Sequence, residues 1–506
     1  MSTASIFASH KVRTSFALAV LPALLAACVS SSGIAPKAET RQLAQQPLAA
    51  VAGVAVAPQS ERWWEVFGDT QLNELVTAAL KDNPSLAVAQ ARAERANIVI
   101  RGAEAAYGPN VTLSGQPMMQ RFQEHYIYPA PLAGTVGTNN RFGLDFSGEI
   151  DFWGKHRAAL HNAQALEKLA IAEYQASRLL IASSLVRGWG ELDRLTRQHQ
   201  LVERQLQVRE ESLGLLKLRE KAGFEPGVER AQGEVSTASL RAELRTLEER
   251  AILQRHLVAV LAGREPGEGD KLRLPSMREV PASLPAQLPA ELLARRPDVA
   301  ASRWRVEAAT QDAAVTKASF YPNVNLVGFL GFQSLGLENW LLMGSRTFSV
   351  GPVISLPVFD AGRLRATYGM KTTDIDAAVA QYNQSLLDGL REIVDDLTQL
   401  QGTALAQVEQ QTVLDKSREV ESMLGRRETR GLINRIPVLN ASVQRLTAER
   451  AMVDLAARRF DTSVQLIRAT GGDGAAALPA LLPPTQQTST QPAAPTRAAA
   501  EQKEQS

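Results

Sequence analysis

Hydrophobic and polar residues alternate in two short stretches of the chain, residues 141–150 and 348–356. The apolar positions are Phe142, Leu144 and Phe146 in the first stretch, and Phe348, Val350, Pro352 and Ile354 in the second. A period of two with one apolar face predicts β-strands. Half-buried strands of soluble sheets share this pattern with strands of transmembrane barrels, which are apolar outside and polar inside. The pattern therefore leaves both classes open.

A second pattern, typical of long helices, occupies much of the remaining chain. No proline occurs between Pro131 and Pro226 or between Pro357 and Pro437. Residues 155–221 are mainly good helix formers, and one continuous helix there would be about 100 Å long, which exceeds any globular core. A return helix is expected after Pro226 and again after Pro437. The second return helix has a partial heptad seam at Leu439, Val443, Leu446 and Val453.

The chain also contains the same kind of segment twice. "NPSLAVAQARAERA" at 83–96 resembles "RPDVAASRWRVEAA" at 296–309, which lies 213 residues later. At the same offset, "PNVTLSG" at 109–115 resembles "PNVNLVG" at 322–328. Each half contains a helical segment, Pro-Asn-Val with a first strand, a second strand and a long helix, in that order. Such self-similarity predicts a tandem repeat. The predicted units are a first repeat at 61–265, a linker at 266–287 and a second repeat at 288–472.

Two strands in each repeat give four strands in the chain. Four strands cannot close a membrane barrel, because single-chain barrels have about eight strands or more. An open sheet edge in lipid would leave backbone polar groups unsatisfied. If the strands cross a membrane, the chain must therefore oligomerise, and three copies would supply twelve strands.

Composition and charge exclude one class of function and predict two unstructured segments. The chain has 55 basic and 53 acidic residues, so it lacks the basic excess of a nucleic-acid-binding protein. Low apolar content and low complexity predict a disordered C-terminal tail at 473–506. Residues 28–60 are polar and contain alanine and proline, which predicts an unstructured tether.

The one cysteine of the chain, Cys28, follows an apolar run of about a dozen residues with charged residues before it. The segment "LAAC" resembles the lipobox of bacterial lipoproteins, which implies a signal peptide at 1–27 and a Cys28 that receives a diacylglycerol and an N-terminal acyl chain. Several acyl chains make a durable anchor in outer-membrane lipid. Val29 follows instead of aspartate, which by the lipoprotein sorting rule implies the outer membrane. A plain signal peptide with an incidental cysteine is the alternative.

Five longer stretches resemble the TolC-like outer-membrane factors, and within them the NodT/OprM-like efflux lipoproteins. They are "WWEVFGDTQLNELVTAALKDNPSLAVAQAR", "GEIDFWGKHRAA", "LPAELLARRPDVAASRWRVEAA", "ASFYPNVNLVGFLGFQS" and "GPVISLPVFDAGRLRA". The resemblance implies an α+β membrane protein. Its fold would be a trimeric 12-stranded outer-membrane β-barrel, with four strands per protomer, continued by a long periplasmic α-helical barrel.

The same resemblance implies a function and partners. A homotrimer of this kind works with a periplasmic adaptor (membrane fusion) protein and an inner-membrane pump. It exports drugs or other toxic small molecules, among them aromatic acids of the fusaric-acid kind. A type I secretion outlet and a non-conducting, periplasm-spanning structural lipoprotein are the alternatives.

In the family the turns that end the long helices form the periplasmic tip, where the pore closes and the adaptor docks. Here these turns are "REKAGFEPGVERA" and "RRETRGLINRIPVLNA". We expect their glycines to adopt a left-handed conformation, their carboxylates to lie near the constriction, and their arginines to pair across helices or to meet the adaptor. Ile433 stands where many relatives have an aspartate, which puts gating by an aspartate ring in doubt. The candidate tip residues are Glu220, Gly223, Glu225, Arg427, Glu428, Arg430, Gly431 and Arg435.

Nothing in the sequence indicates an enzyme. The six histidines lack metal-site spacing, and "AGREPGEGDK" lacks the Gly-Lys-Ser/Thr order of a phosphate loop. We therefore expect no catalytic residues, no metal and no cofactor.

Overall fold

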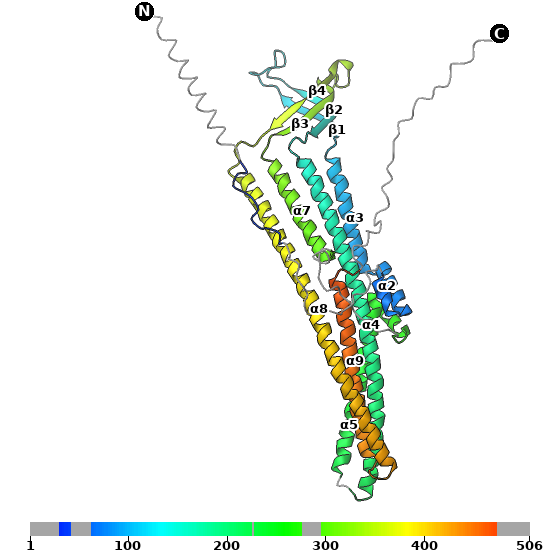
Figure 1. The fold of residues 1–506 in the computed structure, drawn as a ribbon. Coiled ribbons are helices and arrows are strands. Elements are labelled where there is room, and N and C mark those ends of the chain that lie inside the picture. Colours follow the sequence, from blue (N-terminus) through cyan, green and yellow to red (C-terminus); the bar gives the residue numbers. More distant parts are fainter. Residues whose placement is uncertain (1–29, 42–61, 225–226, 276–294, 473–506) are drawn as a thin grey trace, which may run out of the picture.

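The computed structural model describes residues 30–41, 62–224, 227–275 and 295–472. It is a long, narrow molecule with a small β-sheet at one end and two helical turns at the other (Figure 1). The expected signal peptide, Cys28, Glu225, most of the linker and the C-terminal tail lie outside the described residues. None of the described helices has a stretch long and apolar enough to cross a membrane.

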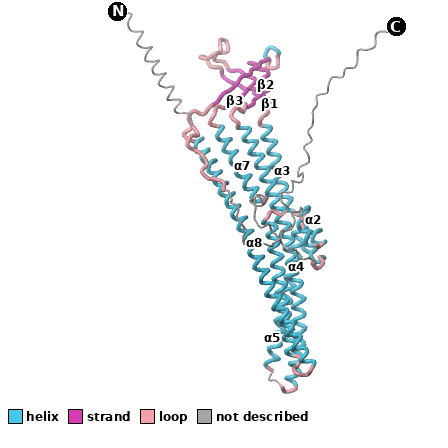
Figure 2. The backbone as a smooth tube through the Cα atoms, in the orientation of Figure 1, coloured by secondary structure: helices cyan, strands magenta, loops and turns pink. Residues whose placement is uncertain are grey.

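Helices make up most of the described chain (Figure 2). The elements in chain order are η1 (Trp63–Phe67), α2 (Thr70–Asp82), α3 (Pro84–Ala105), β1 (Asn110–Arg121), β2 (Val136–Glu149), α4 (Lys155–Lys221), α5 (Val228–Leu261), η2 (Pro266–Lys271), α7 (Pro297–Ala318), β3 (Asn323–Leu335), η3 (Met343–Ser345), β4 (Arg346–Ser355), α8 (Arg363–Thr429) and α9 (Ile436–Ala469).

The two halves repeat the same helices, which confirms the predicted tandem repeat. Helices α3 and α7 both have 22 residues, α4 and α8 both have 67, and α5 and α9 both have 34. Both 67-residue helices follow a glycine with positive φ, Gly154 and Gly362, which lets the chain turn sharply from the sheet into the helix. At ~1.5 Å per residue each is about 100 Å long, as the sequence predicts.

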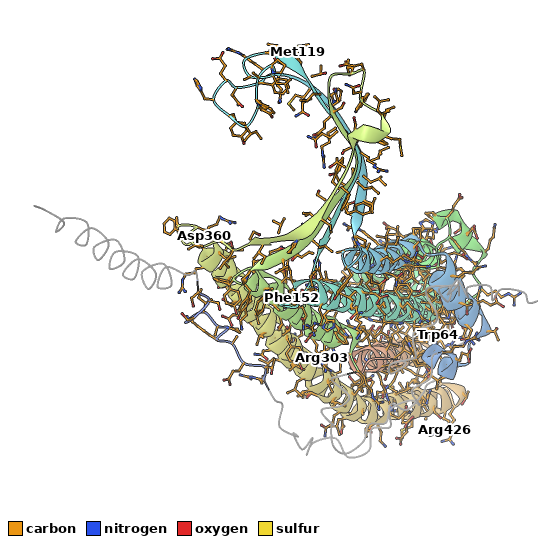
Figure 3. The ribbon with its side chains drawn as sticks, turned by 90° about the horizontal axis from the view of Figure 1, so that it is seen from above. Trp64, Met119, Phe152, Arg303, Asp360 and Arg426 are labelled. Atoms are coloured by element: carbon orange, nitrogen blue, oxygen red, sulfur yellow. The ribbon has the colours of Figure 1, made fainter. Side chains whose placement is uncertain are left out.

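The four strands form one antiparallel sheet in the order β1-β2-β3-β4. The pair β2–β3 joins the first repeat to the second, with Asp145 opposite Phe329. Seen from above, the strands form one curved band that leaves the helix ends and carries Met119 at its far end (Figure 3). The α+β fold class is therefore confirmed.

The register gives the sheet two different faces. One face carries exposed apolar side chains, and the other carries mainly serine, threonine, asparagine, glutamine and glycine. The exposed apolar side chains of the first face include Leu113, Leu144, Phe146, Leu330, Phe348, Val350 and Ile354. This is the alternation that the sequence predicts, and we call these the apolar face and the polar face of the sheet.

The main hydrophobic core lies about midway along the molecule, where η1 and α2 pack beside α4 (Figure 1). Trp189 of α4 is fully buried there, and its Nε1 donates to Asp69 Oδ2 at 3.0 Å. Asp69 also caps α2, since its Oδ1 accepts from the backbone N–H groups of Gln71 and Leu72. One buried carboxylate thus ties the start of α2 to the long helix α4.

Residues 30–41, which we call the N-terminal strap, lie along α8. The backbone N–H groups of Lys37 and Ala38 donate to Asp376 Oδ1 at 2.7 and 2.8 Å. Seven residues further along α8, Asn383 accepts a hydrogen bond from the Arg41 N–H and donates one to the Glu39 carbonyl. The expectation of an unstructured tether is wrong for these residues, because side chains of α8 bind the strap's backbone, which composition cannot reveal.

Candidate functional site

The two helical turns at the far end of the molecule have the same backbone geometry. Gly223 and Gly431 have φ of 77° and 68°. In each turn the glycine N–H bonds to the carbonyl three residues back, and the next N–H bonds to the carbonyl five residues back. This is the Schellman motif, in which a left-handed glycine satisfies the last carbonyls of a helix. The glycines thus have the conformation that the sequence predicts.

In the first turn, Arg230 of α5 joins two carboxylates. Its Nε lies 2.7 Å from Glu220 Oε2 at the end of α4, and its Nη1 lies 2.7 Å from Glu234 Oε2 on α5. The hydrogen bond to Glu234 is the main cause that raises the pKa of Arg230, followed by the charges of Glu220 and Glu234. The same hydrogen bond lowers the pKa of Glu234. Arg230 therefore fastens α5 to α4 beside the turn.

In the second turn, Arg435, the residue before α9, also joins two carboxylates. Its Nη1 lies 3.1 Å from Glu428 Oε2 on α8, and its Nε lies 2.9 Å from Glu211 Oε1 on α4. The hydrogen bonds to Glu211 and then to Glu428 raise the pKa of Arg435. Because Glu211 belongs to the first repeat and Glu428 to the second, this one guanidinium links the two helical hairpins at the end of the molecule.

The structure separates the predicted tip residues into two groups. Glu220, Glu428 and Arg435 are paired, so two of the three carboxylates expected at the constriction are neutralised within their own chain. Among the described residues Arg427 and Arg430 make no ion pair, and both are exposed. Of the three arginines expected to pair across helices, only Arg435 does so. Glu225 and Cys28 lie outside the described residues.

Sequence reasoning missed three members of the two ion-pair clusters, Glu211, Arg230 and Glu234. Arg230 and Glu234 are four residues apart on one helix, a spacing that by itself indicates an ion pair. Glu211 gives no such signal, because 224 residues separate it from Arg435. Within the described residues no group of three histidine, cysteine, aspartate or glutamate side chains could hold a metal ion.

Comparison with known proteins places this architecture in a family. The family model described as "Outer membrane efflux protein" matches residues 75–263 and 288–472, one match in each half of the chain. The fusaric acid resistance protein FusA of Burkholderia cepacia is 31% identical over 376 residues, which is 71% of this chain and 70% of FusA. The putative multidrug resistance outer membrane protein MdtQ of Escherichia coli K12 is 27% identical over 90% of this chain and 98% of MdtQ.

Solved structures give the same result. The outer membrane protein VceC of Vibrio cholerae superposes with a TM-score of 0.75 at 33% identity, covering 82% of this chain and 99% of VceC. The outer-membrane channel OprN superposes with a TM-score of 0.77 at 28% identity, covering 87% and 99%. The two-faced sheet, the paired long helices and the two matches of the family model thus all indicate the same family. The chain belongs to the outer membrane efflux protein family, and its fold is that of an outer-membrane channel.

Proposed function

We propose that three copies of this chain form an outer-membrane duct that exports toxic small molecules delivered by an inner-membrane pump through a periplasmic adaptor. The strands would form a 12-stranded barrel, four from each copy, and the helices would continue the duct into the periplasm. Cys28, with its lipid, would anchor each copy beside the barrel.

The observation that carries this proposal is the two-faced sheet. Its exposed apolar side chains suit lipid, and its polar face suits a water-filled lumen. The sheet ends at β1 and β4, whose outer edges have no strand beside them among the described residues. Such edges must be paired in a membrane, and further copies of the chain can pair them. A non-conducting scaffold would need neither face.

The helices also favour association with further copies. α8 leaves a series of large apolar side chains exposed, and so does α5. Rows of apolar residues on long helices are typical of helix-to-helix packing. These exposed residues include Val394, Leu405, Val408, Val420 and Met423 on α8, and Val228, Val235, Leu253 and Leu257 on α5.

We assign the closed state of the duct to the tip. Arg435 would hold the α8–α9 hairpin against α4 until the adaptor docks on the exposed parts of both turns. Arg427 and Arg430, which are exposed and unpaired among the described residues, are the side chains we assign to adaptor contact. Transport then needs no chemistry in this chain, because the pump supplies the energy.

The cargo is proposed from the relatives. FusA is named for fusaric acid resistance and MdtQ for multidrug resistance. We infer that this chain exports drugs or aromatic acids of the same general kind and thereby gives resistance to them. The pump would set the finer specificity.

Single-channel conductance of the purified, lipidated protein in planar bilayers tests the proposal. We expect a trimer by mass and small currents in the wild type. Arg435→Ala should increase the conductance, because it removes the ion pair with Glu211 that joins the two hairpins, as well as the pair with Glu428 inside the second hairpin. Arg427→Ala is the matched control, since it removes the same charge from the same tip without breaking an ion pair.

Two results would contradict this account. A verified trimer without conductance in the wild type and in Arg435→Ala would exclude a duct. Equal conductance of the Arg435→Ala and Arg427→Ala proteins would leave the duct standing but would remove Arg435 from its gate.

A further inference from the structure

A layered cluster of side chains lies on the polar face of the sheet. Its floor is a pair of glycines, Gly143 of β2 and Gly331 of β3, which lie opposite each other. A Cβ added to either glycine would come closer than 3 Å both to backbone atoms of the facing strand and to the Phe329 ring. The ring of Phe329 therefore covers the place that two missing side chains leave, and it is itself only 8% exposed.

Arg141 forms the next layer. Its guanidinium carbon lies 3.7 Å from the centroid of the Phe329 ring, which is a cation–π contact. The edge of the guanidinium is held by Asp145, with Nη2 2.5 Å from Oδ1, and Asp145 in turn accepts a hydrogen bond from Ser114. Arg141 is thus fixed in place on three elements of one sheet: its own strand, β1 and β3.

The order of the layers determines which side of the guanidinium is open. Backbone lies lowest, the Phe329 ring covers it, and the guanidinium lies on the ring. The Arg141 side chain still has 31% of its surface exposed. Since Phe329 covers one flat side and Asp145 binds an edge, the outer flat side is the part left to the lumen. No other lysine or arginine lies on the polar face within the residues of β1–β4.

We propose that this cluster, Arg141 with Phe329 and Asp145, is a stacking site for planar aromatic solutes on the wall of the duct. The proposal rests on the proposed function, because it requires that the polar face line the lumen. A solute ring would lie on the open side of the guanidinium, so that the cation is enclosed between two aromatic rings.

The chemistry specifies the solute class by shape more than by charge. Asp145 already compensates the positive charge of Arg141, so a solute gains little from a full ion pair here. A flat π-system gains the cation–π attraction and dispersion contact with the planar guanidinium. A saturated molecule of equal charge and similar size has no flat face to offer. Brief residence is also what a duct requires, since solutes must leave as readily as they bind.

The experiment compares two carboxylates that differ only in aromaticity, 2-naphthoate and decahydronaphthalene-2-carboxylate. Each is added to the purified trimer in planar bilayers, and the lifetime of brief current interruptions is measured. Wild type should show longer interruptions with 2-naphthoate. Arg141→Lys keeps the charge but not the plane, and we expect it to shorten them by roughly two- to fivefold, the range of an exposed cation–π contact.

Two further variants sharpen the test. Arg121→Lys makes the same exchange at the end of β1 and should leave the lifetimes unchanged. Arg141→Gln combined with Asp145→Asn replaces the ion pair by a neutral hydrogen-bonded pair and should shorten the interruptions as Arg141→Lys does. In all variants the open-channel current in potassium chloride verifies that the barrel has folded.

The outcomes separate this inference from the duct itself. Normal currents with equal lifetimes for the two carboxylates in the wild type would overturn the stacking site alone. So would variants of Arg141 that retain the wild-type lifetimes. A folded trimer without any current in the wild type and in Arg435→Ala would overturn the proposed function and the stacking site together.

Discussion

Asp396 lies on α8 with only 3% of its surface exposed, and among the described residues its Oδ2 has no hydrogen-bond partner. Burial, and then the charge of Glu392, raises the pKa of Asp396 to about 7. Arg468 opposes this shift, while Asp395 and Asp461 add to it. A carboxylate that is ionised at neutral pH in such a place costs stability, so this residue is a destabilising element of the helix bundle.

The sign of the pH dependence follows from proton binding. The folded state holds the Asp396 proton up to a pH of about 7, whereas an unfolded aspartate loses it near ~4. Stability therefore falls as the pH rises from about 4 to about 7 and is lowest above that range. We predict that Asp396→Asn raises the midpoint of thermal unfolding at pH 8, and raises it less at pH 5.

The exposed neighbour provides the control for that measurement. Asp395 has 54% of its side chain exposed and pairs with Arg391, so Asp395→Asn should change the midpoint little at either pH. An equal gain from Asp396→Asn at pH 5 and pH 8 would contradict a titrating Asp396.

Individual residues were predictable from sequence where the cause is local. Gly223 and Gly431 could be assigned because helix ends need a left-handed residue, and the alternation around Phe142 could be assigned because strand side chains alternate. Arg435 was predicted to pair, but Glu211 was not, since its proximity depends on how two repeats pack. Phe329 over Gly143 likewise depends on strand register, which the pattern alone does not fix.

At the scale of elements, the N-terminal strap is held by side chains that bind backbone groups. Each such hydrogen bond contributes about 0.5–1.5 kcal/mol, and Asp376 with Asn383 makes four of them. The strap's own apolar contacts are few, since Ile34 and Ala38 are only partly buried. Arg365 of α8 also donates to the Ser30 and Ser32 carbonyls at the start of the strap. Polar side chains of α8 therefore carry a large part of the strap's attachment, and Asp376 with Asn383 hold residues 37–41.

We predict that the double variant Asp376→Ala, Asn383→Ala releases residues 37–41 of the strap and speeds trypsin cleavage after Lys37 and Arg41. The midpoint of thermal unfolding should change little, because these residues are mostly exposed and can detach before the helix bundle unfolds. The Asp374→Ala protein, changed at an exposed residue of the same helix, should be cleaved by trypsin at the wild-type rate. Unchanged cleavage in the double variant would mean that other contacts hold the strap.

The long helices were the easiest elements to predict and the strap was the hardest. An absence of proline over many residues, together with helix formers, specifies a helix without any knowledge of its surroundings. The strap has no periodic pattern, and its conformation is imposed by α8. Composition was therefore the only guide to these residues, and it predicted an unstructured tether.

At the scale of the whole molecule, we expect arginine substitutions on the two faces of the sheet to have different effects on stability, even at neighbouring residues. Val350 lies on the apolar face with 74% of its surface exposed, and Ser349 lies on the polar face beside it. We predict that Val350→Arg destabilises the membrane-inserted trimer by about 2–4 kcal/mol, the cost of an arginine facing the lipid midplane. Ser349→Arg should fold and insert normally, because its side chain reaches water.

Folding into lipid vesicles, titrated with urea, measures both variants. Equal stability of Val350→Arg and Ser349→Arg would mean that the apolar face does not meet lipid.

The overall fold was predictable from the sequence because the internal repeat and the hydrophobic pattern agree along the chain. The site was less so, because ion pairs and stacked rings arise only where distant segments meet.

The equal lengths of the paired helices restrict how the channel can be remodelled. Four helices reach the tip, α4 and α8 with 67 residues and α5 and α9 with 34, and the two turns keep their relative position only while these lengths stay matched. Removing seven residues from α4 alone would lift one turn by about 10 Å and leave its partner behind. A shorter or longer channel can therefore be built only by editing both repeats together, by whole heptads, in descending and returning helices alike.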